Sequence, residues 1–134
     1  YQNKIWQTRP RPFVDRMASA WLIKNFIDKE ARFIFNEMID PFAISFDMQD
    51  ATISHIGDFC TFEVLLKSFS LENEALLEIA KLVHNLDIND DKYHAPHAEG
   101  IRLILSSIRE TSKDDDEIIK KSGTIFDYIV KNQH

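Results

Sequence analysis

The chain has 134 residues, enough for one domain with a hydrophobic core, and its 44% hydrophobic and 28% charged residues exclude global disorder. The formal net charge of −6 makes nucleic acid an unlikely partner, because nucleic-acid binders normally carry a basic face. Cys60 is the only cysteine, which excludes an internal disulfide, and no apolar run approaches the roughly 20 residues that span a bilayer. We therefore expect a single cytoplasmic domain over residues 1–134 with no membrane partner.

The first third of the sequence predicts short strands around one helix. Residues 4–9 are typical of a strand that ends at two prolines, and residues 15–28 carry apolar residues at helical spacing. Residues 31–37 and 42–48 are rich in the aromatic and β-branched side chains that favour strands. We expect a small N-terminal β-sheet of about three short strands.

The remainder of the sequence predicts helices. Phe62, Leu65, Leu66 and Phe69 follow the i, i+3, i+4, i+7 pattern, and residues 72–87 and 101–110 continue in the same rhythm. The acidic residues 113–117 are typical of a helix start, where the dipole favours carboxylates. The fold class predicted is therefore α+β, mainly helical.

One stretch, SHIGDFCTFEVLL (54–66), concentrates polar residues next to an apolar helix. Asp58 or Thr61 could cap that helix, and Glu63 in its first turn would be favoured by the helix dipole. Helix capping does not explain His55. Cys60 lies among aromatic residues, so we expect its side chain to be buried and to contribute to packing.

A second polar interruption lies at the end of the predicted helix 72–87. Asp87 falls on the apolar row of that helix, and His84, three residues earlier, shares its face. A buried carboxylate is costly without a cation, a metal or several donors. The structural alternative is that Asp87 lies past the helix end and His84 packs with one hydrogen bond.

The two segments together suggest a metal site made of His55, Glu63, His84 and Asp87. Two imidazoles with carboxylates suit iron, manganese or zinc, and we expect one transition-metal ion, with iron or manganese favoured. Asp47 could orient a ligating histidine, and Asp58 could also lie in this outer layer. His94 and His97 form a rival pair, but Pro96 between them favours a loop.

The N-terminal arginines suggest an anion site. Arg9 and Arg11 point toward the start of the first helix, whose free N–H groups attract anions, and guanidinium groups offer paired donors. Arg16 follows on an apolar row of the helix and is expected to pair with Asp15 or another carboxylate. The alternative is a set of surface ion pairs.

These motifs, in the order WQTRPRPFVDRMASAWLIKNFID, ARFIF, ISFDM, SHIGDFCTFEVLL and VHNLDIND, resemble the C-terminal domain of the chromate-resistance protein ChrB, a family also called chromate resistance exported protein. The resemblance runs from about residue 4 to residue 91 and returns in IFDYIV near the end of the chain. The family pattern includes the arginines, Asp15 and Trp21, and the positions of His55, Asp58, Glu63, His84 and Asp87. Full-length members carry a further N-terminal domain.

The resemblance implies a role in chromate response, and three hypotheses follow. The first is a metal-binding domain of chromate or oxidative-stress defence, which would act as a redox enzyme on superoxide or an oxyanion drawn in by the arginines. The second is a non-enzymatic sensor of chromate or a related small inorganic anion. The third is a structural or dimerisation module, in which His55 and His84 are satisfied core residues. The sequence does not decide whether the domain is an enzyme or a sensor, which metal it would bind, or whether the chain forms a homo-oligomer.

Overall fold

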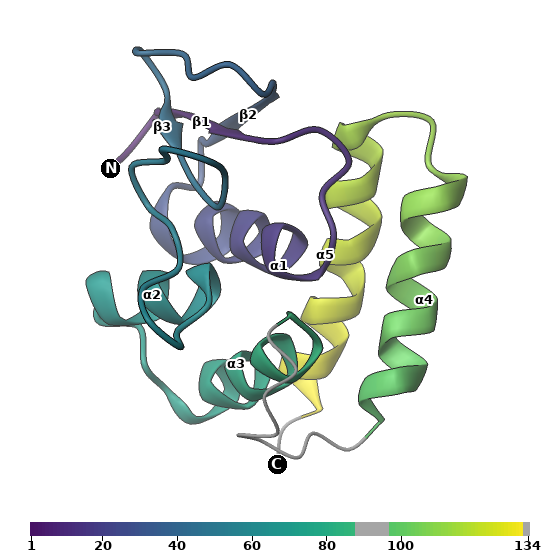
Figure 1. The fold of residues 1–134 in the computed structure, drawn as a ribbon. Coiled ribbons are helices and arrows are strands. Elements are labelled where there is room, and N and C mark those ends of the chain that lie inside the picture. The colour runs from purple at the N-terminus through teal and green to yellow at the C-terminus, as the bar shows by residue number, and fades with distance from the viewer. Residues whose placement is uncertain (88–96, 133–134) are drawn as a thin grey trace.

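The structure, a computed structural model, describes residues 1–87 and 97–132. Its elements follow in the order β1 (Ile5–Thr8), α1 (Val14–Leu22), the π-helix η1 (Ile23–Ile27), β2 (Arg32–Phe35), β3 (Ile44–Ser45), α2 (Thr61–Ser68), α3 (Glu74–Asp87), α4 (Ala98–Thr111) and α5 (Asp115–Lys131). Figure 1 shows the sheet at one end of the molecule and the helices gathered beside and below it. The α+β class predicted from the sequence is confirmed.

The sheet has three strands in the order β2-β1-β3, and β1 pairs in parallel with both neighbours. Parallel pairing requires a crossover, which α1 and η1 supply between β1 and β2. Gln7, fully buried in β1, holds the next connection: its amide donates to the Asn36 and Met38 carbonyls and accepts from the Asp40 N–H. A buried side chain thus fixes the loop that returns to β3.

The helix α1 lies at the centre of the molecule and packs against α2, α3 and α5. Eight of its nine residues are buried, whereas α4, on the outside of α5 in Figure 1, buries only Ala98 and Leu105. The core therefore forms around α1, with Trp6, Phe62 and Phe126 among its largest fully buried side chains. Among the described residues, no helix combines the length and apolar character that a membrane crossing requires.

Two predicted elements differ from those observed. The strand expected over residues 42–48 is reduced to Ile44–Ser45, and Phe46 forms an isolated bridge to Ile53 beyond the end of that strand. The helix expected over 15–28 begins at Val14 and changes to a π-helix, in which the Asp28 N–H donates to the Ile23 carbonyl five residues earlier. The wider turn ends the helix at Asp28.

Candidate functional site

The start of α2 is held by Asp15, a buried carboxylate of α1. Its oxygens accept the Thr61 N–H at 3.0 Å and the Phe62 N–H at 2.9 Å, two of the donors that a helix start leaves without a partner. The prediction that Asp58 or Thr61 caps this helix is wrong, because Cys60 is the N-cap residue and the carboxylate comes from α1. Asp58 lies exposed in the preceding turn.

A buried contact between the side chains of Glu63 and His84 joins α2 to α3. Glu63 Oε1 lies 2.7 Å from His84 Nδ1 and also accepts the Cys60 N–H at 3.0 Å. His84 is fully buried and Glu63 is 6% exposed. Glu63 therefore fixes the orientation of the imidazole, the role that carboxylates commonly have behind a ligating histidine.

Several titratable groups from distant segments act on Asp15 or on Asp87, and we call Asp15, Asp47, His55, His84 and Asp87 the acid–histidine cluster. Burial raises the pKa of Asp15 well above its usual value, and the nearby charges of Asp47 and Asp87 raise it further. Partial desolvation of its carboxyl group and the charge of Asp47 also raise the pKa of Asp87, although the residue is exposed, and Arg16, His55 and His84 partly offset this rise. The charges of His55 and His84 thus act on Asp87, while the site that the sequence predicts from these residues stays a prediction.

The acid–histidine cluster does not have the spacing of a formed metal centre. Across residues 1–87 and 97–132, no group of three or more His, Cys, Asp or Glu side chains is placed to hold a metal ion. Asp87 and His55 are exposed at the surface, while His84 is buried. In the rival pair, His97 precedes α4 with a left-handed φ of 66°, and His94 lies outside the described residues.

Three guanidinium groups come together at the start of α1, and we call Arg9, Arg16 and Arg109 the arginine cluster. Burial lowers the pKa of Arg16, and the positive charges of Arg9 and Arg109 lower it further, while Asp47 and Asp15 raise it. Within the part of the chain that the structure describes, Arg16 forms neither an ion pair nor a side-chain hydrogen bond, so the expected pairing with Asp15 is not made.

Arg109 was not identified from the sequence. It lies on α4 with its guanidinium carbon 5.4 Å from the centre of the Phe13 ring, and its buried Nε has no hydrogen-bond partner in the described structure. A signal was present, since Arg109 continues the helical row of Ile101 and Leu105, and Leu105 is fully buried. The test that identified Asp87, a charge on an apolar row, also identifies Arg109.

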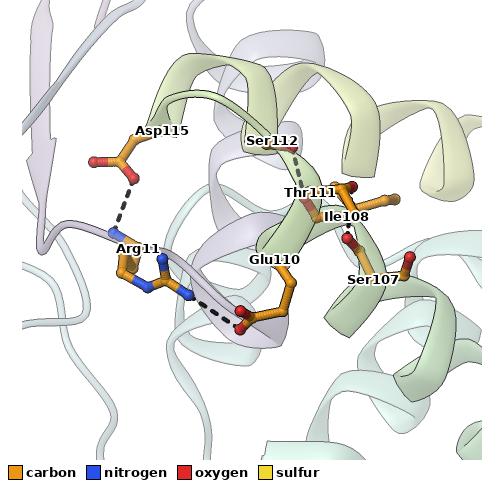
Figure 2. A network of polar contacts seen from close by, with 7 residues as sticks. All are labelled: Arg11, Ser107, Ile108, Glu110, Thr111, Ser112 and Asp115. Atoms are coloured by element: carbon orange, nitrogen blue, oxygen red, sulfur yellow. Dashed lines mark hydrogen bonds and ion pairs between the residues drawn. The ribbon is translucent and has the colours of Figure 1, made fainter.

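Arg11 is engaged elsewhere, as Figure 2 shows. Its guanidinium donates to Glu110 Oε1 at 3.0 Å, and its backbone N–H donates to Asp115 at the start of α5. Both side chains of the ion pair are more than half exposed. Arg11 therefore ties the β1–α1 loop to the α4–α5 junction, whereas Arg9 and Arg16 face other positive charges.

Cys60 is fully buried, as predicted, and burial with the nearby charge of Asp15 raises the pKa of its thiol. A thiol held protonated is a poor nucleophile and a poor ligand. The chemistry of this region therefore belongs to its arginines, carboxylates and imidazoles.

Fold and site together define an α+β domain with a polar centre of gathered arginines, carboxylates and histidines. The chain belongs to the family of the ChrB C-terminal domain, whose sequence profile matches residues 6–133. It is 38% identical over 133 residues to "Protein ChrB" of Cupriavidus metallidurans, a match covering 96% of this chain and 40% of that protein. The chain thus spans about two fifths of this relative's length. No solved structure shows significant similarity.

Proposed function

We propose that this domain binds a small inorganic oxyanion and serves as a sensing domain in chromate resistance. Membership of the ChrB C-terminal family supports the chromate-resistance role. The observation that carries the binding proposal is Arg16, a half-buried guanidinium beside two further guanidinium groups and without an ion pair among the described residues.

Gathering like charges is unfavourable unless opposite charges offset the repulsion, as Asp47 and Asp15 do in part for Arg16 and as a bound anion would do further. Arg9, Arg16 and Arg109 come from the loop before α1, from α1 itself and from α4, so three segments bring positive charge to one place. A tetrahedral dianion has four oxygens that can accept from several guanidinium forks at once. The Nε of Arg109 is buried and has no hydrogen-bond partner in the described structure, so it is a donor that the protein itself leaves unsatisfied.

Calorimetric titration with chromate, and with sulfate as a dianion of the same shape, tests this function. Arg16→Ala and Arg9→Ala should each weaken binding by about tenfold or more, because a charge-assisted hydrogen bond contributes about 1.5–3 kcal/mol. Arg11→Ala is the matched control, since its guanidinium is held by the exposed Glu110. Wild-type protein that binds neither anion, or an Arg16→Ala variant with unchanged affinity, would overturn the proposal.

A second candidate function, a redox-active metal centre, is favoured by the Glu63–His84 contact. A carboxylate at 2.7 Å from Nδ1 orients the imidazole, and the charges of Asp87, Asp47 and His55 act at the same place. Burial and the neighbouring carboxylates raise the pKa of Asp87 and Asp15, and a cation bound there would offset both effects. Iron or manganese held by His55, His84 and Asp87, with Glu63 behind His84, would supply electron transfer to superoxide or an oxyanion.

Elemental analysis of protein purified without chelator decides this candidate. A stoichiometric metal lost on His84→Ala and Asp87→Asn would establish the centre. Glu74→Gln is the control, since Glu74 lies exposed at the opposite end of α3. Protein that carries no metal and takes up neither iron nor manganese would end the metal hypothesis and leave the oxyanion proposal intact.

A further inference from the structure

A cavity lies away from the arginine cluster, between the end of α1, the strand β2 and the helix α5. Its volume is about 510 Å³, within the range of small-molecule sites. Trp21, Ala31, Phe33, Ile119 and Gly123 provide the apolar part of its lining. Trp21 is 3% exposed and its indole N–H donates to Asp127 at 2.9 Å, so this flat ring is fixed in place.

The rim of this cavity carries an excess of positive charge. Lys24, Arg32 and Lys120 lie on it against the carboxylates Asp116 and Asp127, so three positive and two negative side chains leave one positive charge. The Lys24 ammonium is fixed by donation to the Ala31 carbonyl at 3.0 Å, whereas Arg32 and Lys120 form no ion pair within the described residues. An anionic group is thus favoured at the rim of an apolar cavity.

Two unusual features of the backbone lie at the lining of this cavity. The π-helix η1 directly follows Trp21 and Leu22, and its Lys24 and Asn25 lie on the lining; π-helical turns are frequent at functional sites. Gly123 lies inside α5, where glycine is less favourable than alanine. A Cβ at Gly123 would lie 3.6 Å from the Trp21 ring, an ordinary contact, so packing does not require glycine here.

We infer that this cavity binds a small molecule with a flat apolar body and one anionic group, such as an aromatic carboxylate or sulfonate. The body would lie against Trp21 and Gly123, and the anionic group would lie at the rim near Lys120 and Arg32. The inference is independent of the arginine cluster, because the two sites share no residue.

Two fluorescent probes test the inference: anilinonaphthalene sulfonate, and N-phenylnaphthylamine, which has a similar body without the charge. The sulfonate should bind the wild-type domain more tightly than the neutral probe. Gly123→Leu, whose side chain fills the cavity, should weaken binding of both probes by about tenfold or more. Lys120→Glu should weaken only the sulfonate, and Lys131→Glu, an identical charge change at the far end of α5, should weaken neither.

Thermal unfolding of each variant shows whether it is folded, and Lys120→Glu tests the site even if Gly123→Leu is unstable. Sulfonate binding that is equally strong in wild type, Gly123→Leu and Lys120→Glu would overturn the inference. Equal affinity of the wild type for the charged and the neutral probe would also overturn it.

Discussion

Two buried aspartates of this domain accept backbone hydrogen bonds in similar ways but differ in the charges around them. Asp28, at the end of η1, accepts from the Asn3, Lys4 and Glu30 N–H groups and from the Trp6 indole. Burial alone would raise its pKa, but these four donors lower it. Asp28 is therefore a carboxylate whose charge the fold satisfies completely.

Asp15 has a different environment. It accepts two backbone N–H groups and, at 3.3 Å, the Ser19 hydroxyl, yet burial and the charges of Asp47 and Asp87 raise its pKa well above the usual value. Unbalanced charge of this kind is typical of functional sites. The difference teaches that burial alone does not distinguish a structural polar residue from one beside a binding site, whereas the balance of nearby charges does.

The largest effect is expected from substitution of Asp28, the aspartate whose charge is satisfied by hydrogen bonds. Asp28→Ala removes one acceptor from four donors, including the buried Trp6 indole, and should lower the free energy of unfolding by about 3 kcal/mol. Urea denaturation measures this loss. Glu37→Ala, an exposed carboxylate in the loop after β2, is the control and should change stability by less than about 0.5 kcal/mol. A loss for Asp28→Ala as small as the control would show that the four hydrogen bonds contribute little.

The pH dependence of the stability of Asp28→Asn tests the comparison of the two aspartates further. Because the folded-state pKa of Asp28 is lowered, its stabilisation is present above the unfolded value of 3.8 and is lost as the pH falls through the folded pKa. The stability difference between wild type and Asp28→Asn should therefore be largest near neutral pH, about 2 kcal/mol, and shrink below pH 3.8. A difference that grows on acidification would contradict the assigned direction.

The sequence predicted the elements of this fold better than its long-range contacts. Apolar spacing identified the helices because periodicity is local, and the strand at residues 31–37 was confirmed as Arg32–Phe35. The cap of α2 was predicted wrongly because its carboxylate lies 46 residues before Thr61. The secondary-structure propensity of the residues around Thr61 carries no information about a contact with a residue so far away in the sequence.

The same limit applied to the site. His84 and Asp87 are predicted as site residues because polar residues interrupt an apolar row, and in the structure the charges of His84 and His55 act on Asp87. Arg109 gave an equivalent signal, but its proximity to Arg16 depends on how α4 packs. The separation of Arg11 from Arg16 depends on the ion pair between Arg11 and Glu110. The spacing of residues along the sequence does not reveal that pair.

Asp15→Asn should show the opposite pH dependence from Asp28→Asn. A raised folded-state pKa means that the ionised form destabilises the fold above that pKa, and that this cost disappears as the pH falls toward 3.8. The variant should thus be closest to wild type at neutral pH, with a loss of about 1 kcal/mol for the altered hydrogen bonds to α2, and fall further behind at acidic pH. Denaturation of both variants across the same pH series provides the check; parallel pH profiles would remove the distinction between the two aspartates.

The smallest effects are expected from substitutions of two arginines, Arg11 in the loop before α1 and Arg16 in α1. Arg11→Ala breaks an exposed ion pair and should cost about 0.5 kcal/mol of stability, a loss that added salt reduces. Arg16→Ala removes a half-buried charge that Arg9 and Arg109 oppose and that Asp47 and Asp15 favour, and without an anion we expect it to cost no more than Arg11→Ala. Thermal unfolding with and without sulfate separates the two residues: sulfate should stabilise wild type and Arg11→Ala and should have little effect on Arg16→Ala. If Arg16→Ala unfolds the domain in the absence of anion, Arg16 supports the fold as Asp28 does, and the contrast between satisfied and unbalanced charge would not extend to the arginine cluster.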